Sequence, residues 1–162
     1  MIEYTLFALQ ILFLSYFIFV LVKKQDRNLV SLLVFNISVF VWVVSILLIT
    51  RIHDVSISIW FARFTFSATA IAVLSYSSFF ESYTKYSKKI FSRIMSIWGI
   101  SMSILPMTSY LISDMNLVDG SNYPAVEFGN FAILYVLYVV IAVLSLVYQV
   151  LRLKKTSSGL EY

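Results

Sequence analysis

The run ISIWFARFTFSATAIAVLSYSSFF, residues 57–80, carries one charge, Arg63, in 24 positions. Crossing a bilayer core of about 30 Å takes about 20 apolar residues in a helix. Four further runs of this length carry no charge at all, at residues 4–22, 29–50, 94–113 and 128–151. Transmembrane β-strands would need only about 10 residues each and strict alternation. The runs therefore predict an all-α fold, a polytopic five-transmembrane-helix bundle in a single domain, residues 1–155, followed by a polar tail at 156–162.

The composition of the whole chain agrees with a membrane protein. Hydrophobic residues make up 60% of the 162 residues and charged residues 12%, against about 45–50% and about 25% in soluble proteins. A soluble domain of this size would need more polar surface to cover its core. The composition excludes soluble globular, disordered, coiled-coil and nucleic-acid-binding classes, so we expect membrane lipids and no nucleic acid as partners. The chain has no Cys, which excludes disulfides and thiol chemistry.

The basic residues mark one side of the predicted membrane. Ten of the twelve Lys and Arg residues follow the first, third and fifth runs: Lys23, Lys24, Arg27, Lys85, Lys88, Lys89, Arg93, Arg152, Lys154 and Lys155. The opposite side holds Arg51 and the acids Glu3, Asp54, Asp114, Asp119 and Glu127. Loops rich in Lys and Arg stay in the cytoplasm. The pattern predicts a multi-pass protein of the bacterial plasma (inner) membrane, with its N-terminus outside and its C-terminus cytoplasmic.

Groups that could carry out catalysis are scarce. The single histidine, His53, lies in a predicted outer loop beside Asp54, and a lone histidine does not make a metal site. No Asp or Glu lies within a predicted span, which excludes a proton relay of the pump type. The segment Ser82-Tyr83-Thr84-Lys85 matches a Ser–Lys nucleophile pattern, but Lys85 belongs to a basic interfacial loop. We therefore expect no enzymatic activity, no catalytic residues, no metal and no cofactor.

Arg63 is the one charge within a span, and it allows two interpretations. It lies five residues from the centre of its helix, or about 7.5 Å outward from the midplane. Its side chain either snorkels to the interface beside Trp60 or faces the bundle and meets an acid or an anionic ligand. The ligand or switch candidates are Arg63, Trp60, Gln10 and Asn130, and the candidate ion-pair partners are Asp114, Glu127 and Asp54. Together with Ser45, these polar residues predict a polar pocket open to the outside.

Small residues indicate how the helices pack. Residues 57–80 carry Ala68, Ala72 and Ser75 on one helical face, so this helix is predicted to be the central one, and Ala72→Leu is expected to overpack it. Residues 94–113 carry Gly99 and Ser103 four positions apart and then Pro106, which predicts a kink in the outer half of that helix.

The chain resembles the amino-terminal transmembrane sensor region of bacterial histidine kinases, which has seven helices in that family. The residues that carry the resemblance are the segment 60–63, a small apolar stretch ending at Phe79-Phe80, and the basic segment 152–155 after the last run. The resemblance implies signal input in a two-component system, with Trp60 and Arg63 as the implied residues. That family continues into two further helices and a kinase core, so the chain is expected to be a truncated input module or a free-standing relative.

The sequence leaves several functions open. The leading expectation is a sensory module that passes a stimulus from the outer half of the bundle to a cytoplasmic partner or output domain, acting as a homodimer or with another signalling protein. The alternatives are an accessory or assembly subunit of a membrane complex and a small transporter or channel. A transporter would need a polar path, for which Asn36, Ser75 and Gln149 form a sparse lining.

Overall fold

The described part of the chain forms five α-helices and a β-hairpin. The computed structural model describes residues 2–24, 27–52, 54–84, 89–117 and 124–157. The helices are α1 (Ile2–Lys24), α2 (Arg27–Arg51), α3 (Val55–Thr84), α4 (Lys89–Ile104) and α5 (Ala132–Ser157), with a 3-10 turn, η1, at Leu105–Met107. The strands β1 (Ile112–Leu117) and β2 (Pro124–Phe128) lie between η1 and α5. His53, and the polar tail beyond Ser157, lie outside the described residues.

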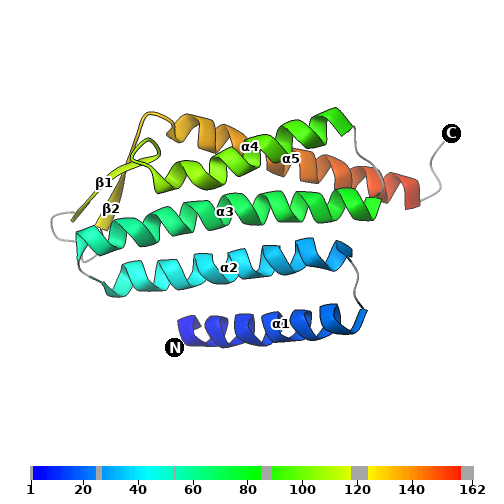
Figure 1. Cartoon of the computed structure of the whole chain (residues 1–162), viewed down its shortest axis with the longest axis horizontal. Helices are drawn as coiled ribbons and strands as arrows, with labels where there is room; N and C mark the ends of the chain where they lie inside the picture. The colour runs from blue at the N-terminus through cyan, green and yellow to red at the C-terminus, as the bar shows by residue number, and fades with distance from the viewer. Residues whose placement is uncertain (1, 25–26, 53, 85–88, 118–123, 158–162) are drawn as a thin grey trace.

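The helix α3 is the centre of the molecule. Figure 1 shows α1, α2 and α3 side by side in a row of alternating direction, with α4 and α5 on the other side of α3. Among the described residues, α3 contacts α2, α4, α5, η1 and both strands, whereas the main contact of α1 is with α2. This confirms the prediction that the third helix is central. Its hydroxyl groups are compatible with this place because Thr65, Thr69, Ser75 and Ser78 each donate to the carbonyl four residues earlier.

Three of the helices are long and apolar enough to cross a membrane. They contain the segments Leu29–Arg51, Val55–Ser82 and Ala132–Leu151, which belong to α2, α3 and α5. The corresponding apolar segment within α1 is shorter, Gln10–Val20, and α4 has 16 residues. A 16-residue helix is about 24 Å long, which is less than the hydrocarbon thickness.

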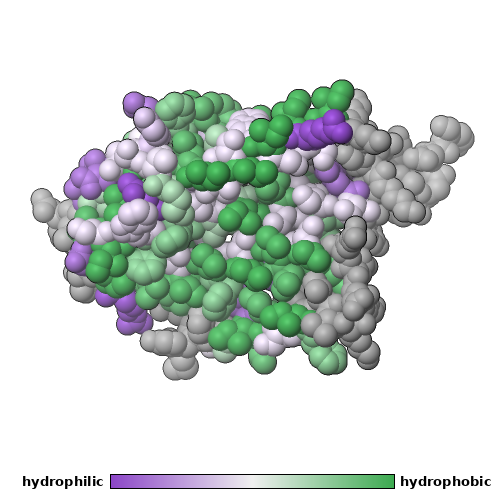
Figure 2. Space-filling model, viewed as in Figure 1, coloured by the Kyte–Doolittle hydropathy of each residue, from purple (hydrophilic) through white to green (hydrophobic). Residues whose placement is uncertain are grey.

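The surface and the interior have the distribution expected in lipid rather than in water. Large apolar side chains point outward along the helices, as Leu12, Ile133 and Leu144 do, each more than 60% exposed. The buried polar residues are Asn36, Ser38, Ser45, Ser58, Ser67, Ser75 and Gln149. Figure 2 shows hydrophobic side chains over the middle of one face and hydrophilic ones toward its two ends, most of them at the hairpin end. A soluble monomer rarely exposes an apolar surface of this extent.

The region after α4 differs from the all-α prediction. The helix ends at Ile104 instead of continuing to 113, and α5 begins at Ala132 instead of 128. The intervening chain forms an antiparallel hairpin that pairs Asp114 with Glu127, with an irregularity between Ile112 and Asp114. Only Ile112 and Ser113 of this strand belong to the predicted run 94–113; the rest of that run after α4 is the charge-free segment 105–111, which includes η1.

Pro106 ends a helix instead of kinking one. The predicted kink requires the helix to continue past the proline, but Pro106 lies buried within η1, the 3-10 turn that closes α4. Proline has no N–H to donate, so the regular hydrogen bonding of α4 stops there. The chain is then free to turn into β1.

Candidate functional site

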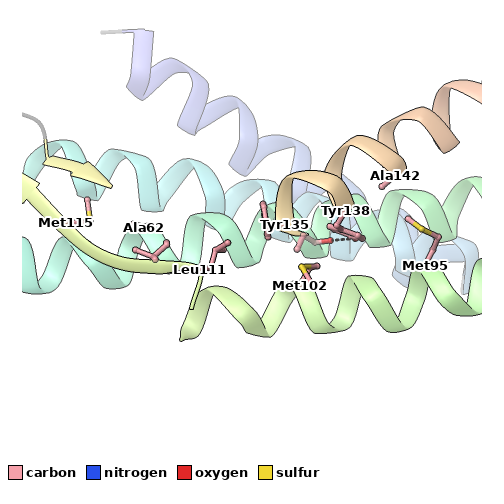
Figure 3. Packing of buried hydrophobic residues seen from close by; sticks show 10 residues of the cluster. Ala62, Met95, Met102, Leu111, Met115, Tyr135, Tyr138 and Ala142 are labelled. Atoms are coloured by element: carbon pink, nitrogen blue, oxygen red, sulfur yellow. Dashed lines mark hydrogen bonds between the residues drawn. The ribbon is translucent and has the colours of Figure 1, made fainter. Parts of the chain in front are cut away.

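The β-hairpin is seated on α3 by a small apolar core. Leu111, Ile112 and Met115 are at most 1% exposed, and they pack in one cluster with Ala62 of α3 and Tyr135 of α5 (Figure 3). Burial of apolar side chains drives this contact as it does in a soluble domain. The hairpin therefore joins the start of α3 to the start of α5.

Arg63 is bound to the hairpin backbone. Its Nη2 donates to the carbonyl oxygen of Ile112 at 3.4 Å, and its guanidinium carbon lies 5.0 Å from the centre of the Trp60 ring. Its Nε is buried and has no hydrogen-bond partner among the described residues. A carbonyl oxygen and the face of an indole both stabilise a cation. Arg63 thus links α3 to β1.

The structure does not show the predicted ion pair of Arg63. The side chains of Asp54, Asp114 and Glu127 are all described, and none of them forms an ion pair with Arg63. Each carboxylate has another local partner. Asp54 accepts the N–H groups of Ser56 and Ile57 and caps α3, Asp114 accepts the N–H of Met115, and Glu127 accepts the side-chain amide of Asn116.

The other polar candidates do not gather around Arg63. Gln10 donates from its Nε2 to the carbonyl oxygen of Asn36 at 3.3 Å, and so joins α1 to α2. Asn130 is exposed in the turn before α5, and Ser45 is buried in α2. The predicted polar pocket of Arg63, Gln10, Ser45 and Asn130 is therefore not assembled.

Gly129 allows the segment before α5 to pack closely against the segment before β1. The N–H of Gly129 donates to the carbonyl of Leu111 at 2.8 Å, and the N–H of Phe131 donates to the carbonyl of Tyr110 at 3.1 Å. A Cβ at Gly129 would lie 2.7 Å from the carbonyl oxygen of Ser109 and closer still to that of Tyr110. Only glycine allows two backbone segments to approach this closely.

Two tyrosines fix the position of α5 against α3. The hydroxyl of Tyr135 donates to the carbonyl of Phe66 at 2.6 Å, and the hydroxyl of Tyr138 donates to that of Ala70 at 3.2 Å. Both rings are buried, and Figure 3 shows them between α3 and α4. A Cβ at Gly99 of α4 would lie 2.8 Å from the Tyr138 hydroxyl, so this glycine makes the room that Tyr138 occupies.

The other predicted packing residues are not equally buried. Ala68, Ser75 and Gly99 are buried, whereas Ala72 and Ser103 are half-buried. Ala72 lines a cavity instead of a close helix contact. Its substitution by a larger residue is therefore no longer expected to overpack the bundle.

A cavity of about 430 Å³ lies between α2, α3 and α5, below the hairpin. Its lining consists of Trp42, Thr65, Phe66, Thr69, Leu111, Phe128, Ala132, Tyr135, Val136, Val139 and Val140. A second cavity of about 210 Å³ follows it along α3 and shares Trp42 and Thr69. The structure thus has an apolar groove where the sequence predicted a polar pocket. Ala132, Tyr135, Val136 and Val139 are spaced three or four residues apart and so share one face of α5. This helical spacing is the sequence signal that could have indicated the groove.

The described residues bring together no group of three or more His, Asp or Glu side chains that could hold a metal ion. Two further buried polar atoms, Ser67 Oγ and Gln149 Oε1, have no hydrogen-bond partner among these residues. The site consists of a hairpin, an apolar groove and the helix α5 that borders both.

No protein-family model, no curated protein and no solved structure matches this chain. Its class therefore rests on the fold alone: a helical protein with three helices long and apolar enough to cross a membrane, and a hairpin at one end.

Proposed function

We propose that the chain is a non-catalytic, multi-pass protein of the bacterial inner membrane that acts as a signal-input module. In this proposal all five helices cross the membrane, with the N-terminus outside. The ten basic residues of the loops and the last turns of α5 then lie in the cytoplasm, and the hairpin lies outside with Asp54, Asp114 and Glu127. The turn η1 extends the short helix α4 toward the outer interface.

The observation that carries the proposal is the continuity of α5. Its first turns border the groove, and the residues directly before it, Gly129 and Phe131, are hydrogen-bonded to the residues directly before β1. The helix then continues without a break to Ser157, past the basic segment 152–155. A helix of 26 residues is about 39 Å long, so α5 reaches from one side of the bilayer to the other. Because α5 is one unbroken helix, a change in the hairpin or the groove that moves the first turn of α5 also displaces the cytoplasmic end of α5.

Arg63 and Trp60 are the residues proposed to couple the outer end to the bundle. Arg63 holds β1 on α3, and Trp60 holds the guanidinium in place. A displacement of the hairpin must break or re-form this contact. The cytoplasmic end of α5 would then act on a signalling protein or on a second copy of the chain, as in two-component systems.

A distance measurement between α3 and α5, at the end opposite the hairpin, tests whether the hairpin is coupled to the cytoplasmic end of α5. Spin labels at Ser82→Cys of α3 and Leu151→Cys of α5, both exposed, report the separation of the two helices at the end opposite the hairpin. In lipid nanodiscs, Arg63→Ala should shift this distance by about 1–2 Å, the size of helix shifts in known switches. Arg63→Lys should give a smaller shift, because a point charge reproduces the geometry of a guanidinium only partly.

The matched control is Ile133→Ala, which truncates an exposed side chain in the first turn of α5. It should leave the distance unchanged. If Arg63→Ala also leaves it unchanged, the outer end is not coupled to the cytoplasmic end and the signal-input proposal is wrong. The orientation is tested separately: Cys at Ser121 should react with a membrane-impermeant reagent from outside, and Cys at Ser87 only from the cytoplasm.

A role as an accessory subunit is the second candidate. It is favoured by α1, whose main contact among the described residues is with α2 and which exposes Leu12 and Phe19. Crosslinking from α1 to a different membrane protein in cells, together with an unchanged distance in the Arg63→Ala variant, would favour this candidate over signal input.

A further inference from the structure

We infer that the groove between α2, α3 and α5 binds one acyl chain of a membrane phospholipid, which enters sideways from the bilayer. The inference rests on the proposed membrane insertion of these helices and adds a ligand class to the proposed input module. It does not depend on the coupling between Arg63 and the cytoplasmic end.

The shape of the groove suits a chain. Its two cavities, of about 430 and 210 Å³, share Trp42 and Thr69 and so follow each other along one face of α3. The lining on α3 extends from Thr65 to Tyr76, which corresponds to about 16 Å of helix. The combined space lies within the range of small-molecule sites, about 300–1,000 Å³, and it is elongated.

The chemistry of the lining selects a hydrocarbon. The hydroxyls of Thr65 and Thr69 donate to carbonyls of their own helix, and the hydroxyl of Tyr135 donates to the carbonyl of Phe66. These three groups therefore offer the groove their methyl groups and a ring face, and have no donor left for a ligand. Apart from Trp42 and Tyr76, which each carry one polar group on a large apolar ring, the other lining residues are apolar. An apolar cavity of this size stays dry and takes up apolar molecules, because an empty one forfeits dispersion contacts.

The position of the groove gives lipid access to it. Its walls are α2, α3 and α5, the three helices that are long and apolar enough to cross a membrane. Among the described residues the main contacts of α2 are with α1 and α3, and those of α5 are with α3 and α4, so the groove opens between α2 and α5. Trp42, Val136 and Val140 border this opening and are all exposed, whereas Tyr135 is buried at its floor.

The hairpin closes the groove at one end. Phe128 of β2 lies edge-on to Phe66 with 5.7 Å between the ring centres, and Phe66 lies edge-on to Tyr135 at 5.5 Å. An acyl chain in the groove ends against these rings and contacts the first turns of α5, directly after the segment that is hydrogen-bonded to the start of the hairpin. A bound acyl chain would thus contact the hairpin and α5, the elements of the proposed input module.

Photocrosslinking tests the inference with the full chain in nanodiscs. The probe is phosphatidylcholine with a diazirine on the acyl chain, and the labelled residues are identified by mass spectrometry. The control is Val147, an exposed residue of α5 that does not line the groove. Labelling of the groove residues Thr69 and Val139 should exceed labelling of Val147 by about tenfold, which corresponds to about 1.4 kcal/mol in binding free energy. Equal labelling would overturn the inference, because the groove would then be ordinary lipid-facing surface.

Matched variants separate filling of the groove from general disturbance. Val139→Phe fills the groove and should lower labelling of Thr69 by about tenfold, whereas Val147→Phe, the same change on the lipid-facing side, should leave it unchanged. Thr69→Leu is a second filling variant, in case Val139→Phe does not fold, and should lower labelling of Val139. Unchanged labelling in both filling variants would overturn the inference.

Two further probes identify the source of the chain. A diazirine fatty acid and a diazirine prenyl alcohol are offered in place of the phospholipid. Competition of the phospholipid signal by unlabelled phosphatidylcholine supports the inference, and labelling by the fatty acid or prenyl probe alone overturns it. The spin-label distance in the Arg63→Ala variant is independent of these results, so failure of the proposed function can be told from failure of the lipid site.

Discussion

The hairpin junction and the α1–α2 edge are held together in different ways. At the hairpin, apolar side chains such as Leu111 and Ile112 are fully buried, and backbone segments touch at Gly129. At the α1–α2 edge, large apolar side chains face outward, and the contact includes a hydrogen bond from Gln10 to the carbonyl of Asn36. The first region resembles a soluble core, whereas the second has the polar and close contacts used between helices in lipid. The difference is that large apolar side chains are almost completely buried at the hairpin junction and largely exposed at the α1–α2 edge.

The largest effect is expected at Gly129. Gly129→Ala places a Cβ against the backbone carbonyls of Ser109 and Tyr110, neither of which can rotate away. The hairpin must then separate from α5, at a cost of about 3 kcal/mol or more. Thermal unfolding in detergent measures this loss. The neighbouring variant Asn130→Ala changes an exposed side chain and should unfold like the wild type; a Gly129→Ala protein of wild-type stability would show that the junction is not closely packed.

A smaller loss is expected at Gly99. Gly99→Ala brings a methyl group to within 2.8 Å of the Tyr138 hydroxyl and 3.0 Å of a Leu74 methyl, which should cost about 1–3 kcal/mol. Combining it with Tyr138→Phe removes the clashing oxygen, so the double variant should be more stable than the sum of the single effects predicts. Ser101→Ala, on the exposed side of α4, is the control. Additive effects would mean that Gly99 and Tyr138 do not touch.

The two alanines Ala70 and Ala72 should respond differently to the same change. Ala70 is fully buried at the contact with α5, so Ala70→Leu should cost about 1–3 kcal/mol. Ala72 lines the 210 Å³ cavity, so Ala72→Leu fills space and should change stability by less than about 1 kcal/mol. Unfolding temperatures of the two variants, measured in one detergent, give the comparison. Equal losses would indicate that the cavity is closed in solution.

The smallest effect is expected at the α1–α2 edge. Gln10→Leu removes the hydrogen bond to the carbonyl of Asn36, and interhelical bonds of this kind contribute about 0.6 kcal/mol. Accessibility of α1 to hydrogen exchange should rise slightly while that of α3 and α5 does not change. Ser15→Ala, which loses only a bond within α1, should have no such effect. A loss as large as that at Gly129 would mean that the edge is part of the core.

The sequence predicts the helices well where apolar runs are continuous. The runs at 4–22, 29–50 and 57–80 match α1, α2 and α3 to within a few residues, because a long apolar run has few alternatives to a helix. The central place of α3 also follows from its small residues. The fourth run was misjudged because residues 105–113, which follow α4, carry no charge, so the charge-free run continues past the point where Pro106 and η1 end the helix.

The partner of Arg63 shows where sequence reasoning ends. Its depth in the helix and its neighbour Trp60 follow from the order of residues, since both lie on α3 within one turn. Its contact with the carbonyl of Ile112 does not, because residues 49 positions apart meet only when the hairpin folds back on α3. The acids that seemed available are bound by backbone and amide donors close to them in the chain.

The sequence by itself determined that the chain is apolar and helical, and which ends of its helices are basic, because these properties are sums over neighbouring residues. Only the tertiary structure decided that the site is an apolar groove. Thr65, Thr69 and Tyr135 carry polar hydroxyl groups, but each hydroxyl donates its hydrogen bond to a backbone carbonyl of α3. Whether a polar group is free to bind a ligand depends on its partners, and packing between helices sets those partners.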